Sequence, residues 1–133
     1  MISVLDTNIC IYVINSRSPG AVSRIRREPP GSIGISAVTL AELEHGVSRS
    51  RFPDRNRLAL LEFLFPFKIM DFDQEAAARY GTIRNALERK GTPIGPLDLL
   101  LAAQARSRNL VFVTNNEREF KRIEGLRTEN WAA

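Results

Sequence analysis

The stretch Leu110-Val111-Phe112-Val113-Thr114-Asn115-Asn116 decides the fold class of this chain. Its first four residues form a continuous apolar run, which is typical of a strand that a parallel sheet buries on both faces. The three polar residues after it end the strand. This stretch therefore predicts a buried parallel strand with polar side chains at its carboxyl end.

Four further strand candidates have a weaker pattern. Each consists of a few residues of β type and is followed directly by a polar residue. They span Ile2–Leu5, Ile33–Ile35, Phe67–Phe72 and Leu126–Thr128.

Helical patterns separate these strands. The clearest one starts after the capping residue Asp73, has an apolar stripe that includes Tyr80 and Ile83, and ends at Gly91. The others are predicted over Ile9–Ile14, Pro19–Arg27, Ala37–Arg49, a segment with Leu58, Leu61 and Phe65 on one face, Leu97–Arg108 and Glu117–Lys121. The alternation predicts an α/β three-layer sandwich with a mostly parallel central sheet, built as a single domain over residues 1–133.

Composition agrees with one small domain. The chain has 133 residues, of which 44% are hydrophobic and 26% charged, so a disordered or low-complexity role is excluded. The net charge is +4, and 16 of the 19 basic residues are arginine. Arginine binds phosphate through a planar fork, so the charge favours a nucleic-acid partner, although a solvated basic surface explains it equally well.

Several functional classes are excluded. A single cysteine, Cys10, allows neither an internal disulfide nor a cysteine-ligated zinc site, and a reducing, cytoplasmic location is expected. Cys10 lies in an apolar run and is expected in the core. No apolar stretch reaches the length of a membrane span, and the N-terminus does not resemble a signal peptide. His45 is the only histidine, and no glycine-rich phosphate loop is present.

Polar residues gather where the predicted strands end. Asp6 follows the first strand, Asn116 comes three residues after the last apolar run, and Glu42 and Asp98 lie on helices that start near strand ends. In open α/β sheets, ligands bind beyond the carboxyl ends of the strands. Helix capping is the alternative interpretation for Asp6 and Asp98, and an ordinary solvated helix position is the alternative for Glu42.

Convergence of these acids has a physical consequence. Two carboxylates 4 Å apart repel by about 4 kcal/mol at an effective dielectric constant near 20, so a converged cluster needs a cation or raised pKa values. Ligands that are all oxygen suit Mg²⁺ or Mn²⁺. Such ions activate water against phosphodiesters, so we expect metal-dependent phosphodiester hydrolysis.

Four segments resemble a known family. They are Leu5-Asp6-Thr7-Asn8, Ser36 through Glu42, Ile94 through Leu100, and Val113 through Asn116 with Glu119-Phe120. In this order and spacing they are similar to the PIN-domain ribonucleases, and more narrowly to the VapC toxins of bacterial toxin–antitoxin pairs. The ending Gly125 through Trp131 is similar to their C-terminus as well.

The resemblance implies a Mg²⁺- or Mn²⁺-dependent endoribonuclease with a PIN-like fold. Asp6, Glu42 and Asp98 match the family's catalytic, metal-binding acids, and Thr7, Asn8, Ser36 and Thr114 match its supporting polar positions. The chain departs from the family where many members have Thr-x-Asp, because Asn116 occupies the acidic position. Asn116 and Glu119, one helical turn later, are further candidate ligands, and one tightly held ion is expected.

The resemblance also implies partners. A VapB-type antitoxin and a second toxin protomer are expected, with structured RNA, including transfer RNA, as the substrate. Contacts with proteins are expected on the Leu58/Leu61/Phe65 stripe or on the N-terminal helix, and ordinary core packing is the simpler interpretation of both. Arg84, Arg106 and Arg118 are candidates to hold RNA phosphates at the rim of the site.

Two other functions are consistent with parts of the sequence. A haloacid-dehalogenase-like phosphotransferase also begins with a strand and an aspartate, but it needs a second aspartate at position 8, where this chain has Asn8. A non-catalytic RNA- or protein-binding PIN-like module is the second alternative, and Asn116 is the feature that favours it.

Overall fold

Five short strands form one sheet in the computed structural model, which describes residues 1–132. The strand order is β3-β2-β1-β4-β5, and all neighbouring strands pair in parallel, which confirms the predicted mostly parallel sheet. The strands are β1 (Ser3–Leu5), β2 (Ile33–Ser36), β3 (Lys68–Met70), β4 (Val111–Val113) and β5 (Thr128–Glu129).

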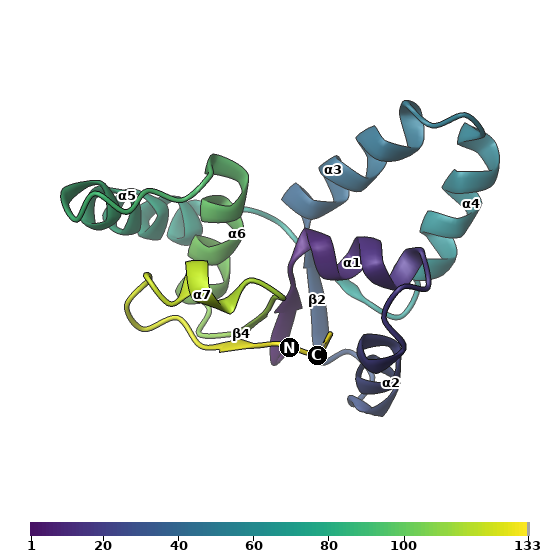
Figure 1. Cartoon of the computed structure of the whole chain (residues 1–133), viewed down its shortest axis with the longest axis horizontal. Helices are drawn as coiled ribbons and strands as arrows, with labels where there is room; N and C mark the ends of the chain where they lie inside the picture. Colours follow the sequence, from purple (N-terminus) through teal and green to yellow (C-terminus); the bar gives the residue numbers. More distant parts are fainter. Residues whose placement is uncertain (133) are drawn as a thin grey trace.

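Helices cover both faces of this sheet and complete the three predicted layers (Figure 1). The longest has 16 residues, and no helix within residues 1–132 combines the length and apolarity that crossing a bilayer requires. The helices are α1 (Thr7–Ile14), α2 (Pro19–Arg27), α3 (Ala37–Ser48), α4 (Pro53–Leu64), α5 (Gln74–Arg89), α6 (Pro96–Ser107) and α7 (Glu117–Phe120).

Alternating strand residues supply two hydrophobic cores. Val4 and Phe112 pack on the side of α5, α6 and α7, and the Phe112 ring meets the Phe120 ring edge-on at 4.7 Å. The neighbouring residues Leu5 and Val113 pack on the opposite side, against α1 to α4. This alternation is the two-residue period of a strand whose two faces are both buried.

The strand order places a crevice between β1 and β4. The chain adds β2 and β3 on one side of β1, and then β4 and β5 on the other side. Ligands of open α/β folds bind at such a reversal of strand order. At this point the Asp6 N–H donates to the Val113 carbonyl oxygen at 2.8 Å, so Asp6 and Thr114 lie side by side.

Element ends mostly agree with the sequence prediction, and the last strand differs. The sequence predicts this strand at Leu126–Thr128, whereas the structure has it at Thr128–Glu129. Hydrogen bonds from β4 and its end set the register: the Phe112 N–H donates to the Arg127 carbonyl, and the Thr114 N–H donates to the Glu129 carbonyl. The predicted caps are confirmed: the Asp73 carboxylate accepts from Ala76 N–H at 3.0 Å, and Gly91 has a φ of +70° after α5.

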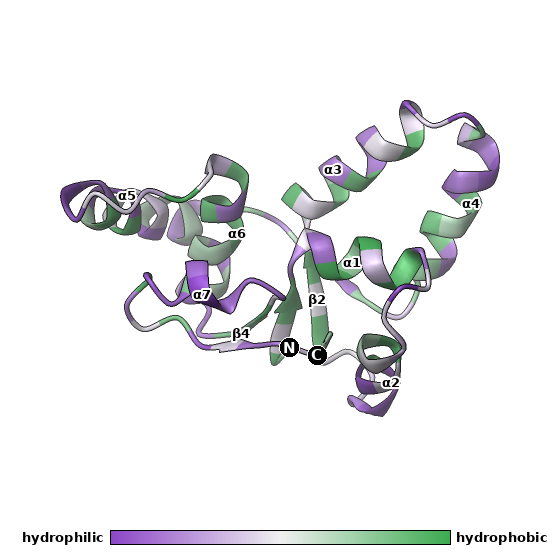
Figure 2. Ribbon diagram, in the orientation of Figure 1, coloured by the Kyte–Doolittle hydropathy of each residue, from purple (hydrophilic) through white to green (hydrophobic). Residues whose placement is uncertain are grey.

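The core-packing interpretation of the α4 stripe is wrong. Leu58, Leu61 and Phe65 are 63%, 58% and 91% exposed, whereas Leu60 is buried. Figure 2 shows β2 as largely hydrophobic and α4 as a helix of mixed hydropathy beyond α1. The helix therefore turns a different face to the core than its spacing predicted, and three large apolar side chains lie at the surface.

Candidate metal centre

Asp6 lies buried at the carboxyl end of β1, where it is 2% exposed. It occupies the N-cap position of α1, but its side chain makes no capping hydrogen bond. Instead, its Oδ2 accepts a hydrogen bond from Thr114 Oγ1 at 2.8 Å. Burial raises the pKa of Asp6, and the Thr114 hydroxyl and the N–H groups of Thr7 and Asn8 offset part of that rise.

Asp98 is half-buried in the first turn of α6, after the Gly95 cap position. Burial is the main reason that its pKa rises to about 6, and the charges of Asp6, Glu119 and Glu42 raise it further. Coulomb interactions of this kind fall off with distance, so three other carboxylates lie near Asp98. The four acids come from four different elements, and their charges act on Asp98 near the β1/β4 reversal of strand order.

Glu42 and Glu119 approach the crevice from opposite sides. Glu42 is half-buried on α3 and, together with Thr7, lines a groove of about 360 Å³ between α1, α3 and α4. Glu119 lies on α7, where its Oε2 accepts from Asn116 Nδ2 at 2.6 Å. Glu119 also raises the pKa of Asp6, which places it near both aspartates.

The supporting polar residues fix the backbone around these acids. Ser36 is fully buried and caps α3 by accepting from Val38 N–H at 3.0 Å, and the Thr7 hydroxyl lies 2.9 Å from that of Thr39. Asn8 and Asn116 are exposed. Thr39 is a fully buried polar residue that the sequence motifs do not identify as part of the site. Its position one turn before the buried Leu43 is the signal that could have identified it.

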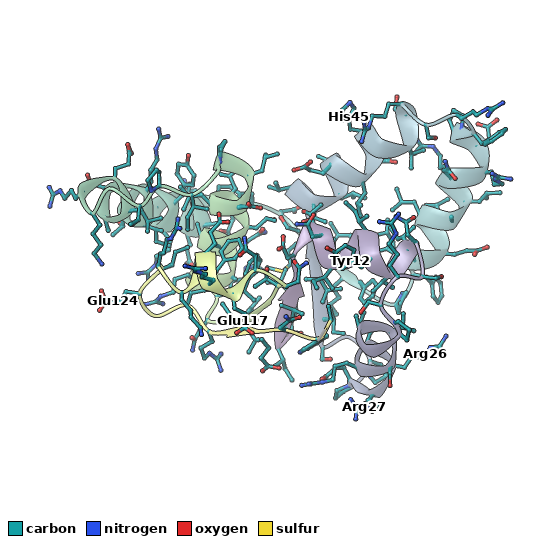
Figure 3. The ribbon with its side chains drawn as sticks, viewed as in Figure 1. Tyr12, Arg26, Arg27, His45, Glu117 and Glu124 are labelled. Carbon is teal, nitrogen blue, oxygen red and sulfur yellow. The ribbon has the colours of Figure 1, made fainter. Side chains whose placement is uncertain are left out.

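A second hydrogen-bonded pair joins α1 to the loop after β4. Asn115 Nδ2 donates to the Tyr12 hydroxyl at 3.0 Å, and Figure 3 shows Tyr12 on α1 near the centre of the molecule. The Asn116 N–H donates to Thr114 Oγ1 at 3.0 Å, so the Thr114 hydroxyl links Asp6 to this loop. Local hydrogen bonds therefore hold two of the acids, Asp6 and Glu119, in place.

The donor set fits a hard divalent cation. It consists of carboxylate oxygens, and these repel one another until a cation is present. Within residues 1–132, no three Asp, Glu, His or Cys side chains are already grouped closely enough to hold a metal ion. Mg²⁺ requires no such group, because it usually takes one or two carboxylates and keeps several water ligands.

The reactive side chains Cys10 and His45 are not suited to join the acids. Cys10 is fully buried. Burial is the main reason that the pKa of its thiol lies well above the ordinary range, and the charge of Asp6 raises it further, so the thiol stays protonated. His45 is exposed on the part of α3 beyond Glu42 (Figure 3). The predicted core position of Cys10 is confirmed.

Two of the three predicted rim arginines have other surroundings. Arg84 donates to Glu88 at 3.0 Å and to the Tyr80 hydroxyl at 3.2 Å. Arg106 lies eight residues after Asp98 on α6, which is about 12 Å along the helix axis, so it is not at the rim. Arg118 is exposed on α7, beside Glu119 in the sequence.

Comparison with known proteins agrees with this architecture. The family model described as the PIN domain matches residues 3–126, which is most of the chain. The chain belongs to the PIN-domain family. The phosphotransferase alternative is thereby excluded, and the predicted resemblance is confirmed.

The relatives of this PIN domain are VapC ribonucleases. It is 45% identical over 129 residues to the tRNA(fMet)-specific endonuclease VapC of Shigella flexneri, with 97% of each chain covered. It is 43% identical to ribonuclease VapC2 of Haemophilus influenzae, with 96% of each covered. The crystal structure of DNA-bound VapBC from Salmonella typhimurium superposes with a TM-score of 0.93 at 42% identity, covering 98% of this chain and 99% of that one.

A Thr114→Val substitution tests the frame around Asp6. The variant loses the hydrogen bond to Asp6 and leaves the Asn116 N–H unpaired. We expect the rate of RNA cleavage to fall about tenfold, because removing a group that orients a metal-binding side chain typically has an effect of this size. The pKa of Asp6 should rise, which moves the acidic limb of the pH–rate profile upward. Thr114→Ser keeps the hydroxyl and should restore both the rate and the profile. Equal profiles for the two variants would contradict this role for Thr114.

Proposed function

We propose that this PIN domain is a Mg²⁺- or Mn²⁺-dependent endoribonuclease and the toxin of a type II toxin–antitoxin pair. The observation that carries the proposal is the buried Asp6 at the strand-order reversal of a basic domain, with Asp98 close enough for the charges of Asp6, Glu119 and Glu42 to raise its pKa. The VapC ribonucleases to which the chain is 43–45% identical support the same activity.

Asp6 and Asp98 are the proposed direct ligands of the ion. Both lie at the crevice on rigid elements, the end of β1 and the first turn of α6. Glu42 and Glu119 would hold water ligands from α3 and α7. Since Asn116 adds no charge and binds Glu119 instead, we propose one tightly held ion.

Each residue has a defined task in this proposal. A bound divalent ion supplies water activation and neutralises charge on the phosphate. Thr114 fixes the rotamer of Asp6, and Asn116 orients Glu119. Asp98 holds a proton below about pH 6, and that proton must leave before the carboxylate can bind a cation. Loading with metal therefore improves as the pH rises through 6.

The proposed substrate is structured RNA, with transfer RNA as the leading candidate. Arginine supplies most of the positive charge of the chain, and its planar fork matches phosphate. The Shigella flexneri relative is named for cleavage of tRNA(fMet), which points to the same class of RNA.

A VapB-type antitoxin is the proposed partner, and a homodimer the proposed assembly, in the cytoplasm. Solved structures of relatives from Salmonella typhimurium and Rickettsia felis are VapBC complexes. The exposed Leu58 and Leu61 of α4, with Phe65 directly after the helix, leave an apolar surface for such a contact. A single free cysteine is consistent with a reducing cytoplasm.

Metal removal tests the catalytic proposal. We expect purified protein to cleave a transfer RNA pool in Mg²⁺ or Mn²⁺, to stop in excess EDTA, and to resume when Mg²⁺ exceeds the chelator. Sequencing of RNA 5′ ends identifies the cleaved bond. RNA that binds but stays intact in every metal would favour the non-catalytic module instead.

A further inference from the structure

A basic groove runs along α5, from Arg79 to Lys90, and meets α6 at Arg106. It has a volume of about 320 Å³ and is bounded by α5, the last turns of α6 and the loop between α7 and β5. Apolar side chains, including Ile83 and Ile123, line part of it. Its charged side chains are four cations and one carboxylate: Arg79, Lys90, Arg106, Arg122 and Glu124.

Among residues 1–132, no carboxylate lies within ion-pair distance of the four cations of the α5–α6 groove. The ion pairs formed within residues 1–132 use Arg24, Arg57, Arg84 and Arg108. Figure 3 places the groove's carboxylate, Glu124, at the outer edge of its loop. Like charges that gather without counter-charges repel, so this groove is suited to an anionic ligand.

Backbone contacts hold two of these guanidinium groups in place. Arg106 Nε donates to the Glu124 carbonyl oxygen, and Arg122 Nη1 donates to the Pro93 carbonyl oxygen, both at 3.3 Å. Gly125 has a φ of +80°, and a Cβ there would lie 2.6 Å from Arg106 Nε. The loop therefore brings its backbone close against Arg106, which leaves the remaining N–H groups of that side chain for a ligand.

We propose that the α5–α6 groove binds backbone phosphates of the RNA substrate. This inference rests on the proposed function and extends it to a second contact with the same molecule. Arg106 and Asp98 lie about 12 Å apart along α6, so a polymer with regularly spaced phosphates can reach both the acids and the groove. RNA is favoured over an acidic peptide because the proposed function already brings phosphates of the same molecule to the acids, about 12 Å away along α6.

RNA binding at several salt concentrations tests this inference. We expect the double variant R106Q/R122Q to bind labelled transfer RNA about tenfold more weakly at 150 mM KCl, as measured by fluorescence anisotropy in EDTA. The slope of log K against log salt should fall by about 1 to 2, because each lost phosphate contact reduces it by roughly 0.7–0.9. EDTA keeps the RNA intact during the measurement.

The matched control removes two arginines elsewhere. Arg26 and Arg27 are exposed on α2, at the opposite side of the molecule (Figure 3), so R26Q/R27Q makes the same change in net charge. Its affinity should change less than twofold. A second groove variant, R79Q/K90Q, changes residues on α5 and gives the same expected result if R106Q/R122Q does not fold.

The outcomes separate this inference from the proposed function. Groove variants that bind RNA with the affinity and salt slope of R26Q/R27Q would overturn the inference, even if the wild-type protein cleaves RNA. Weaker binding by the groove variants supports it, even if the wild-type protein cleaves nothing.

Discussion

The D6N variant is expected to cleave RNA at least about 10²–10³ times more slowly than the wild-type protein. Asp6 is the most buried of the four acids, and the substitution removes its charge where a cation must be held. Loss of one preorganised electrostatic group in an active site typically has an effect of this size. Asparagine is nearly isosteric and can still accept the Thr114 hydrogen bond, so the loss should come from charge and not from unfolding.

Asp71 supplies the matched control for D6N. It follows β3 directly, as Asp6 follows β1, but its side chain is exposed. D71N should retain the wild-type cleavage rate in a gel assay with Mg²⁺. Full activity of D6N would remove Asp6 from the proposed metal centre and leave the meeting of the carboxylates without a catalytic role.

The position of Asp6 beside Thr114 was predictable from the sequence. Both follow short apolar runs, and a parallel sheet brings the carboxyl ends of its strands to one edge. The α/β class, the caps at Ser36 and Asp73 and the burial of α6 follow from equally local signals. Local patterns succeed here because capping and strand burial are decided by neighbouring residues.

The surroundings of the surface side chains were not predictable in this way. The spacing of Leu58, Leu61 and Phe65 shows that they share a helix face, but it cannot show whether another element covers that face. The location of Arg106 depends on how α6 packs against α5 and on the turn at Gly125. Both are properties of the tertiary arrangement, which periodicity does not contain.

The D98N variant is expected to be more stable than the wild-type protein without metal and less stable with it. Burial and the charges of Asp6, Glu119 and Glu42 raise the pKa of Asp98 to about 6 from an ordinary 3.8, so the folded state binds its proton more tightly than the unfolded state. The unfolding free energy of the metal-free protein therefore falls as the pH rises from about 4 to 6 and stays low above it. At pH 7.5, D98N removes this penalty, which is about 1–2 kcal/mol after allowance for solvent screening of a half-exposed group.

Two opposing contributions set the size of the change in melting temperature. The N-terminus of α6 favours a carboxylate in its first turn by about 0.3–1 kcal/mol, so the net gain of metal-free D98N should be about 2–4 °C. A divalent ion at a hundred times its Kd stabilises the wild-type protein by about 2.7 kcal/mol, and D98N should lose most of that gain. Calorimetry at pH 7.5 with EDTA or Mg²⁺ measures both effects.

The matched control is D54N, because Asp54 is exposed in the first turn of α4 and away from the acids. The D54N variant should have a slightly lower melting temperature than the wild-type protein and an unchanged response to Mg²⁺. The stability order of D98N and wild type should therefore reverse when Mg²⁺ is added, and an unchanged order would show that Asp98 does not bind the ion.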